Sequence, residues 1–194
     1  VLVVNDGSKD RSPAIAQEYA EAFPETVVLV NKENGGHGST INTGIERAKG
    51  KYFRVLDSDD WFNTAEFVEY VERLKNEDAD LVVTDYRKEH TYNSESEYFE
   101  YKDLEDGRCY RLDDIDLKIL NGEYFVMATS AYKTEILRKS GLKLLENTFY
   151  VDMQYNVVPI TKVETFVYYR LDIYRYFIGR KEQSMNMDNF VRNQ

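Results

Sequence analysis

Short apolar runs alternate with helical patterns through the first 85 residues, and this alternation restricts the possible folds most. The strand-like runs are residues 1–4, 27–30, 52–56 and 81–84. The helical patterns are residues 12–22, a stretch from 39 or 40 to 49, and a stretch from Thr64 onward. Strands that alternate with helices in this way form right-handed βαβ units. The sequence therefore predicts an α/β fold with a mostly parallel sheet flanked by helices.

Beyond residue 85 the pattern becomes irregular. Residues 86–111 are charged and rich in Tyr, which favours a hairpin or an irregular excursion over another βα unit. The elements predicted further on are a short helix at 113–120, a strand at 125–132, a helical turn or two at 133–139 and a strand at 163–169. No internal repeat or low-complexity linker divides the chain, so we expect a single domain over residues 1–194.

The composition excludes several classes of protein. The net charge is −10 over 194 residues, which argues against non-specific nucleic-acid binding. The single cysteine, Cys109, rules out an internal disulfide framework and fits a reducing cytoplasm. No apolar run is long enough for a transmembrane helix, and we expect no signal peptide. Because the chain begins inside a strand-like run, we expect sequence before Val1, including a missing N-terminal strand.

Three carboxylates follow the third strand-like run. Asp57, Asp59 and Asp60 lie within four positions, directly before an aromatic pair. They are expected at the carboxyl end of a buried strand, which is where open α/β sheets bind ligands. Carboxylates this close repel one another, and a divalent cation among them offsets that repulsion; Mg²⁺ and Mn²⁺ prefer such oxygen ligands. The alternative is a solvated acidic turn that caps the next helix.

Two further polar segments follow the first and second strand-like runs. Asp6 ends the first run within Asn-Asp-Gly-Ser, where a carboxylate can accept hydrogen bonds from a nucleobase or a ribose; an ordinary Asx turn is the alternative. Residues 34–38, Asn-Gly-Gly-His-Gly, form a predicted flexible loop before a helix, with Asn42 one turn beyond. Backbone N–H groups of such a loop, including that of Gly36, suit a diphosphate.

The second half contains a lone carboxylate and a basic aromatic segment. Asp152 lies among aromatic and apolar residues, which suits a general base; taken alone, the segment favours the alternative of an acid at a helix N-terminus. Residues 174–180, followed by Gln183 and Ser184, place Arg beside aromatic residues. They can contact phosphates or a sugar face, or form a structural strand and turn.

Together these segments resemble the glycosyltransferase family 2 enzymes with the GT-A (Rossmann-like) fold. The resemblance covers about residues 1–85, through residues 3–10, 34–36, 42–50 and 56–61 in matching order and spacing. It is looser from 122 to 184, where Val151-Asp152 stands in place of the family's usual Glu-Asp. That half is similar to bacterial enzymes that build capsular polysaccharides and exopolysaccharides.

The resemblance implies a metal-dependent, inverting glycosyltransferase of the hexosyltransferase type, using Mn²⁺ or Mg²⁺. Asp6 would contact the uracil or its ribose, Asp57 the ribose or donor sugar, and Asp59 the metal. Asp152 would be the base that deprotonates the acceptor. Residues 1–85 would form the nucleotide-sugar-binding half, which includes Gly36 and Asn42, and residues 86–194 the acceptor-facing half.

The implied donor is a nucleotide sugar, in particular a UDP-sugar, and the implied acceptor is a glycan or a lipid-linked glycan in polysaccharide biosynthesis. The implied location is the cytoplasm, with peripheral association at the inner face of the plasma membrane. Two alternatives remain open. A sugar-phosphate nucleotidyltransferase would release pyrophosphate, and a non-catalytic glycan-binding module would bind sugar without metal or nucleotide.

Overall fold

The computed structural model describes residues 1–90, 92–116, 120 and 124–179. It contains two compact units. The first consists of Val1–Phe53 and Thr134–Thr161, and the second of Arg54–Lys133 together with the residues from Lys162 onward. Each unit is therefore built from segments that are distant in the sequence. Among the described residues, no helix is both long and apolar enough to cross a bilayer.

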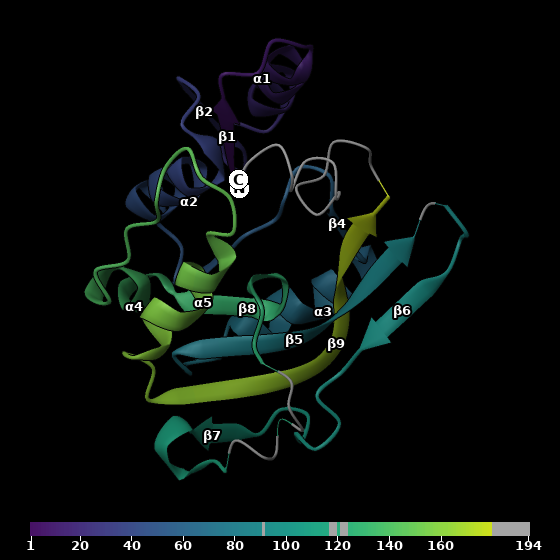
Figure 1. The fold of residues 1–194 in the computed structure, drawn as a ribbon, viewed down its shortest axis with the longest axis vertical. Coiled ribbons are helices and arrows are strands. Elements are labelled where there is room, and N and C mark those ends of the chain that lie inside the picture. The colour runs from purple at the N-terminus through teal and green to yellow at the C-terminus, as the bar shows by residue number, and fades with distance from the viewer. Residues whose placement is uncertain (91, 117–119, 121–123, 180–194) are drawn as a thin grey trace. The chain divides into compact units, whose positions relative to one another are not determined.

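The first unit is built around a parallel pair of strands. β1 (Leu2–Asp6) pairs with β2 (Val28–Lys32), from Leu2 opposite Val28 to Asp6 opposite Lys32. The helices of this unit are α1 (Ser12–Ala22), α2 (Gly36–Arg47), α4 (Thr134–Lys139) and α5 (Asp152–Ile160) (Figure 1). α2 buries Ile41 and Ile45. β3 (Tyr52–Arg54) carries the chain from the first unit into the second.

The second unit is organised by two long neighbouring strands. β5 (Leu81–His90) and β9 (Thr165–Ile178) run parallel, with an irregular register around Asp85 (Figure 1). The shorter strands pair antiparallel with these two, and a helix completes the unit. They are β4 (Trp61–Phe62) and β7 (Cys109–Arg111) on β9, β6 (Ser96–Phe99) and β8 (Ser130–Lys133) on β5, and the helix α3 (Thr64–Leu74).

The structure confirms the predicted α/β class and the strand–helix order of the first 85 residues. Two local predictions after residue 85 hold only in part. Where a helix was predicted at 113–120, the described residues form a 3₁₀ turn (Leu112–Asp114) and then non-helical backbone at 115–116, while residues 117–119 lie outside the described residues. The strand predicted at 125–132 forms only at its C-terminal end: a 3₁₀ turn (Met127–Thr129) precedes β8, which begins at Ser130. The Thr129 hydroxyl donates to the carbonyl of Val126, and such a local bond competes with strand pairing at 126–129.

Candidate functional site

Asp6 ends β1 and organises the start of α2. Its carboxylate accepts hydrogen bonds from the Lys32 ammonium at 2.6 Å and from the backbone N–H groups of Gly35 at 3.0 Å and Gly36 at 2.8 Å. Burial by itself raises the pKa of Asp6, but these bonds outweigh it, so the pKa lies below its usual value. Asp6 thus remains ionised and fixes the Gly-rich segment; the predicted contact with uracil or ribose stays a prediction.

The Gly-rich segment is not the flexible loop that the sequence predicted. α2 begins at Gly36, which has a φ of +79°, instead of at residue 39 or 40. Residues 144–147, which we call the clasp, lie directly on this first turn: the N–H of Asn147 donates to the carbonyl of Gly35 at 2.7 Å. A Cβ on Gly38 would lie 2.1 Å from the carbonyl oxygen of Leu145. Close packing against the clasp therefore explains why residue 38 is a glycine.

Asn42 joins α2 to the same clasp. Its side-chain amide donates to the carbonyl of Leu144 and its oxygen accepts from the N–H of Leu144, both at 2.9 Å. The amide therefore bonds backbone within the first unit. The nucleotide contact predicted for Asn42 stays a prediction, and this paired hydrogen bond is the function that the geometry gives it.

Asp152 is the first residue of α5 and is half-buried. Tyr150, two residues earlier, adopts the left-handed conformation with a φ of 61°. α5 is tied to the clasp because the side-chain oxygen of Gln154 accepts from the N–H of Leu145 at 3.1 Å. The first unit thus brings Asp6, the Gly36 turn and the helix that carries Asp152 into one connected structure. Both interpretations of Asp152, a general base and an acid at a helix N-terminus, fit this position.

The second unit contains residues 57–60, which we call the acid turn. The N–H of Asp60 donates to the carbonyl of Asp57 at 3.1 Å and closes the turn. The Asp60 carboxylate accepts from the Tyr174 hydroxyl at 2.5 Å and from the Phe177 N–H at 2.8 Å. The alternative, in which the acid turn caps the next helix, is wrong, because Asn63 is the N-cap of α3.

The pKa of Asp60 is raised to about 6. Burial is the largest cause, and the charges of Asp57 and Asp59 add to it, while the hydrogen bonds from Tyr174 and Phe177 act in the opposite direction. This mutual repulsion is the condition that a divalent cation relieves. Within the described ranges, no three His, Cys, Asp or Glu side chains form a metal-binding group. Asp57 and Asp59 would supply the one or two carboxylates that Mg²⁺ usually takes alongside phosphate oxygens and water, so the chemistry of these residues suits such an ion.

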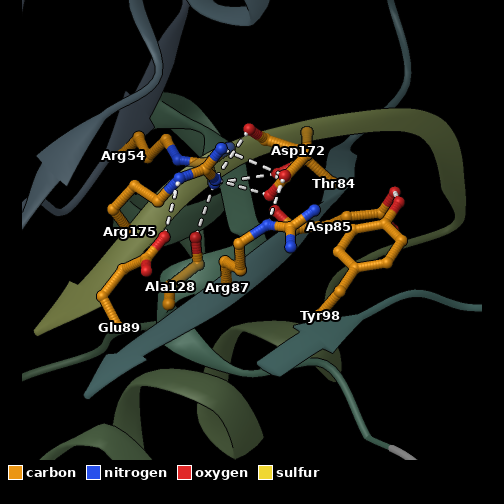
Figure 2. A network of polar contacts seen from close by, with 9 residues as sticks. All are labelled: Arg54, Thr84, Asp85, Arg87, Glu89, Tyr98, Ala128, Asp172 and Arg175. Carbon is orange, nitrogen blue, oxygen red and sulfur yellow. Dashed lines mark hydrogen bonds and ion pairs between the residues drawn. The ribbon is translucent and has the colours of Figure 1, made fainter. Parts of the chain in front are cut away.

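An ion-pair network ties β5 to β9 in the same unit, and sequence reasoning missed it. Figure 2 shows the Asp172 carboxylate between two guanidinium groups. Arg175 reaches it at 2.5 and 3.0 Å and Arg87 at 2.8 Å, while Glu89 pairs with Arg175 at 3.3 Å. The network contains two cations and two anions, so its charges balance. The alternation of apolar and polar residues along β9 does not predict this network, because the register of β9 on β5 shifts beside Asp172.

A second buried acid, Asp85, lies at the register shift of β5. Its side chain is fully buried and accepts from the hydroxyls of Tyr98 and Tyr168, both at 2.7 Å. The pKa of Asp85 is raised to about 6. Burial is the largest cause; the two tyrosine bonds and Arg170 act against it, and the charge of Glu100 adds to it. The folded protein therefore binds this proton more tightly than the unfolded chain, whose Asp pKa is about 3.9.

We expect Asp85→Asn to change how stability depends on pH. Because the folded-state pKa is the higher one, the carboxylate costs stability above about pH 6, and that cost disappears as the pH falls toward 4. The difference in unfolding free energy between variant and wild type should shift by about 3 kcal/mol across this window, in favour of the variant at pH 7.5. Urea unfolding at pH 4, 6 and 7.5 measures it, and a constant difference would contradict the shifted titration.

Known proteins resemble this chain in sequence and in fold. A family model described as Glycosyl transferase family 2 matches residues 1–141. EpsH of Bacillus subtilis (strain 168) is 39% identical over 89 residues, which cover 46% of this chain and 25% of EpsH. The minor teichoic acid biosynthesis protein GgaB of the same strain is 38% identical over 80 residues, covering 40% of this chain and 9% of GgaB.

The crystal structure of S. aureus TarS 1–349 in complex with UDP-GlcNAc superposes with a TM-score of 0.74 at 18% identity. The superposed residues cover 94% of this chain and 50% of the TarS chain. This chain thus spans half or less of the length of EpsH, GgaB and TarS 1–349. The likeness to TarS confirms the predicted GT-A arrangement of sheet and helices. Since the family model covers well over half of the sequence, the chain belongs to glycosyl transferase family 2.

Proposed function

We propose that this chain transfers a sugar, with inversion and with the help of Mn²⁺ or Mg²⁺, from a UDP-sugar to a glycan or lipid-linked acceptor. The acid turn carries the proposal: Asp57 and Asp59 lie in a turn that buried contacts from β9 hold in place. Hydrogen-bonded acids just after a strand are suited to a cation and the diphosphate that it binds.

Asp59 would hold the metal, and Asp57 would contact the ribose or donor sugar. When bound, the metal would stabilise the charge that develops on the departing diphosphate. Asp6 keeps the first turn of α2 in place near the end of β1 by accepting the N–H groups of Gly35 and Gly36. Asp152 would take the proton from the acceptor hydroxyl. The left-handed backbone at Tyr150 supports this role, since such conformations cluster at functional sites.

The UDP-sugar donor is supported by TarS, whose structures were determined in complex with UDP-GlcNAc and with UDP. The context of envelope polysaccharide is supported by GgaB, a protein of minor teichoic acid biosynthesis. Within this proposal residues 1–85 serve mainly the donor and residues 86–194 the acceptor, at the cytoplasmic face of the membrane. Arg180, Gln183 and Ser184, which were candidates for phosphate or sugar contacts, lie outside the described residues.

The test is thermal unfolding of the protein with UDP and Mn²⁺. Ligand at 100 times its Kd stabilises a protein by about 2.7 kcal/mol, which corresponds to a rise in Tm of about 5–10 °C for a chain of this size. The rise should require both components and should disappear in Asp59→Asn, whereas ADP with Mn²⁺ should have little effect.

Other results would favour the alternatives. No rise with any nucleotide would contradict the donor site. Sugar binding that is independent of metal and nucleotide would indicate a glycan-binding module. Release of pyrophosphate from a nucleoside triphosphate and a sugar phosphate would indicate a nucleotidyltransferase.

A further inference from the structure

The Tyr174 hydroxyl bridges two points of the acid turn. Tyr174 is 2% exposed. Its hydroxyl donates to the Asp60 carboxylate at 2.5 Å and accepts from the Asp57 N–H at 3.3 Å. A buried hydroxyl that both donates and accepts in this way fixes the separation of its two partners. Here the partners are the first and last residues of the turn.

Phe177, three residues further along β9, completes the hold on Asp60. Its backbone N–H donates to the second carboxylate oxygen of Asp60 at 2.8 Å. Each oxygen of Asp60 therefore has a donor from β9, and the side chain faces the strand.

The strand that supplies these contacts is itself well anchored. β4 follows the acid turn and pairs with β9, Trp61 opposite Arg175 and Phe62 opposite Tyr174. The ring of Phe62 packs edge-on against Tyr174, with centroids 5.8 Å apart. On the same strand, the guanidinium group of Arg175 donates two hydrogen bonds to the Asp172 carboxylate (Figure 2). The contacts on Asp60 thus come from a rigid support.

The charges explain why such support is needed. Asp57, Asp59 and Asp60 repel one another, and a free turn would relax by moving them apart. With Asp60 fixed by two hydrogen bonds, the turn keeps its shape against this repulsion before any ligand arrives. A preorganised site binds its ligand more tightly, because no binding free energy is lost in ordering the site.

We propose that Tyr174 and Asp60 are positioning residues: the hydroxyl of Tyr174 and the carboxylate of Asp60 hold the acid turn in the shape that presents Asp57 and Asp59 to the donor. The purpose of this arrangement rests on the proposed function. The arrangement itself does not, and it can be measured without ligand.

The first experiment is amide hydrogen exchange of the ligand-free protein, in peptides that cover residues 55–62. Tyr174→Phe should speed exchange there by about tenfold or more, because the Asp57 N–H loses its acceptor and Asp60 loses a donor. Tyr168→Phe is the matched control: it removes the bond that the hydroxyl of another buried tyrosine on β9 donates to a carboxylate, that of Asp85. The control should leave exchange at 55–62 unchanged.

The second experiment is calorimetric titration of the same proteins with UDP in the presence of Mn²⁺. Tyr174→Phe should weaken binding about tenfold and Tyr168→Phe should not. Asp60→Asn, which keeps the volume but offers one acceptor to two donors, should act like Tyr174→Phe and serves in its place should that protein not fold.

The outcomes separate the two proposals. Equal exchange and equal affinity in Tyr174→Phe and Tyr168→Phe would overturn the positioning role. A wild-type protein that fails to bind UDP would overturn the proposed function, while faster exchange confined to Tyr174→Phe and Asp60→Asn would still support the arrangement of the turn.

Discussion

Replacing Asp152 by Asn is expected to slow sugar transfer by about 10²–10⁴-fold and to leave UDP affinity unchanged. Asn has the same shape and the same place at the start of α5, but it cannot accept a proton from the acceptor hydroxyl. Binding of UDP does not need that proton transfer. The expected pattern is therefore a large loss in rate with normal nucleotide affinity and a normal Tm.

The measurement is release of UDP from a panel of UDP-sugars in the presence of acceptor glycans. Glu146→Gln is a suitable control, since it also removes a carboxylate charge from the first unit, six residues earlier and at an exposed position. That variant should keep its activity. Unchanged transfer from every cleavable donor in Asp152→Asn would show that another group is the base.

Gly38→Ala is expected to lower the free energy of unfolding by about 3 kcal/mol. Within a helix, Ala is ordinarily better than Gly by about 1 kcal/mol, so a loss here must come from packing. The new Cβ would lie 2.1 Å from the carbonyl oxygen of Leu145, which is backbone and cannot rotate away as a side chain would. The clasp must then leave α2, with loss of the paired bond between Asn42 and Leu144.

Urea unfolding of the ligand-free protein measures this effect. Gly50→Ala provides the control, because a Cβ there would meet only the carbonyl oxygen of Tyr52, at an ordinary 3.4 Å. We expect that variant to stay within about 0.5 kcal/mol of wild type. A Gly38→Ala protein as stable as Gly50→Ala would mean that the glycine is kept for a ligand and not for the clasp.

The strands and helices of the first 85 residues could be predicted because their signals are local. Apolar periodicity, Ser12-Pro13 and Pro24 all act within a few positions of the elements that they define. The same local reasoning placed Asp57 and Asp59 in a turn after a strand. It failed for the start of α2, because the group that organises this helix start is Asp6, 30 positions before Gly36.

The partners of Asp60 could not be predicted for a similar reason. Tyr174 and Phe177 lie 114 and 117 positions further along, and no local pattern links them to an acid turn. The strand expected at 125–132 forms only at its C-terminal end, in β8, and the cause is different. The Thr129 hydroxyl donates to the carbonyl of Val126 and closes a 3₁₀ turn where apolar periodicity alone favours a strand.

The clasp has a practical consequence for exchanging parts between relatives. Residues 34–42 contact residues 144–147 through backbone atoms and through a glycine that leaves no room for a side chain. Grafting one segment without the other would bring together surfaces that were never fitted to each other. We expect chimaeric enzymes to fold only when residues 34–42 and residues 144–147 come from the same parent, although about a hundred residues separate the two segments in the sequence.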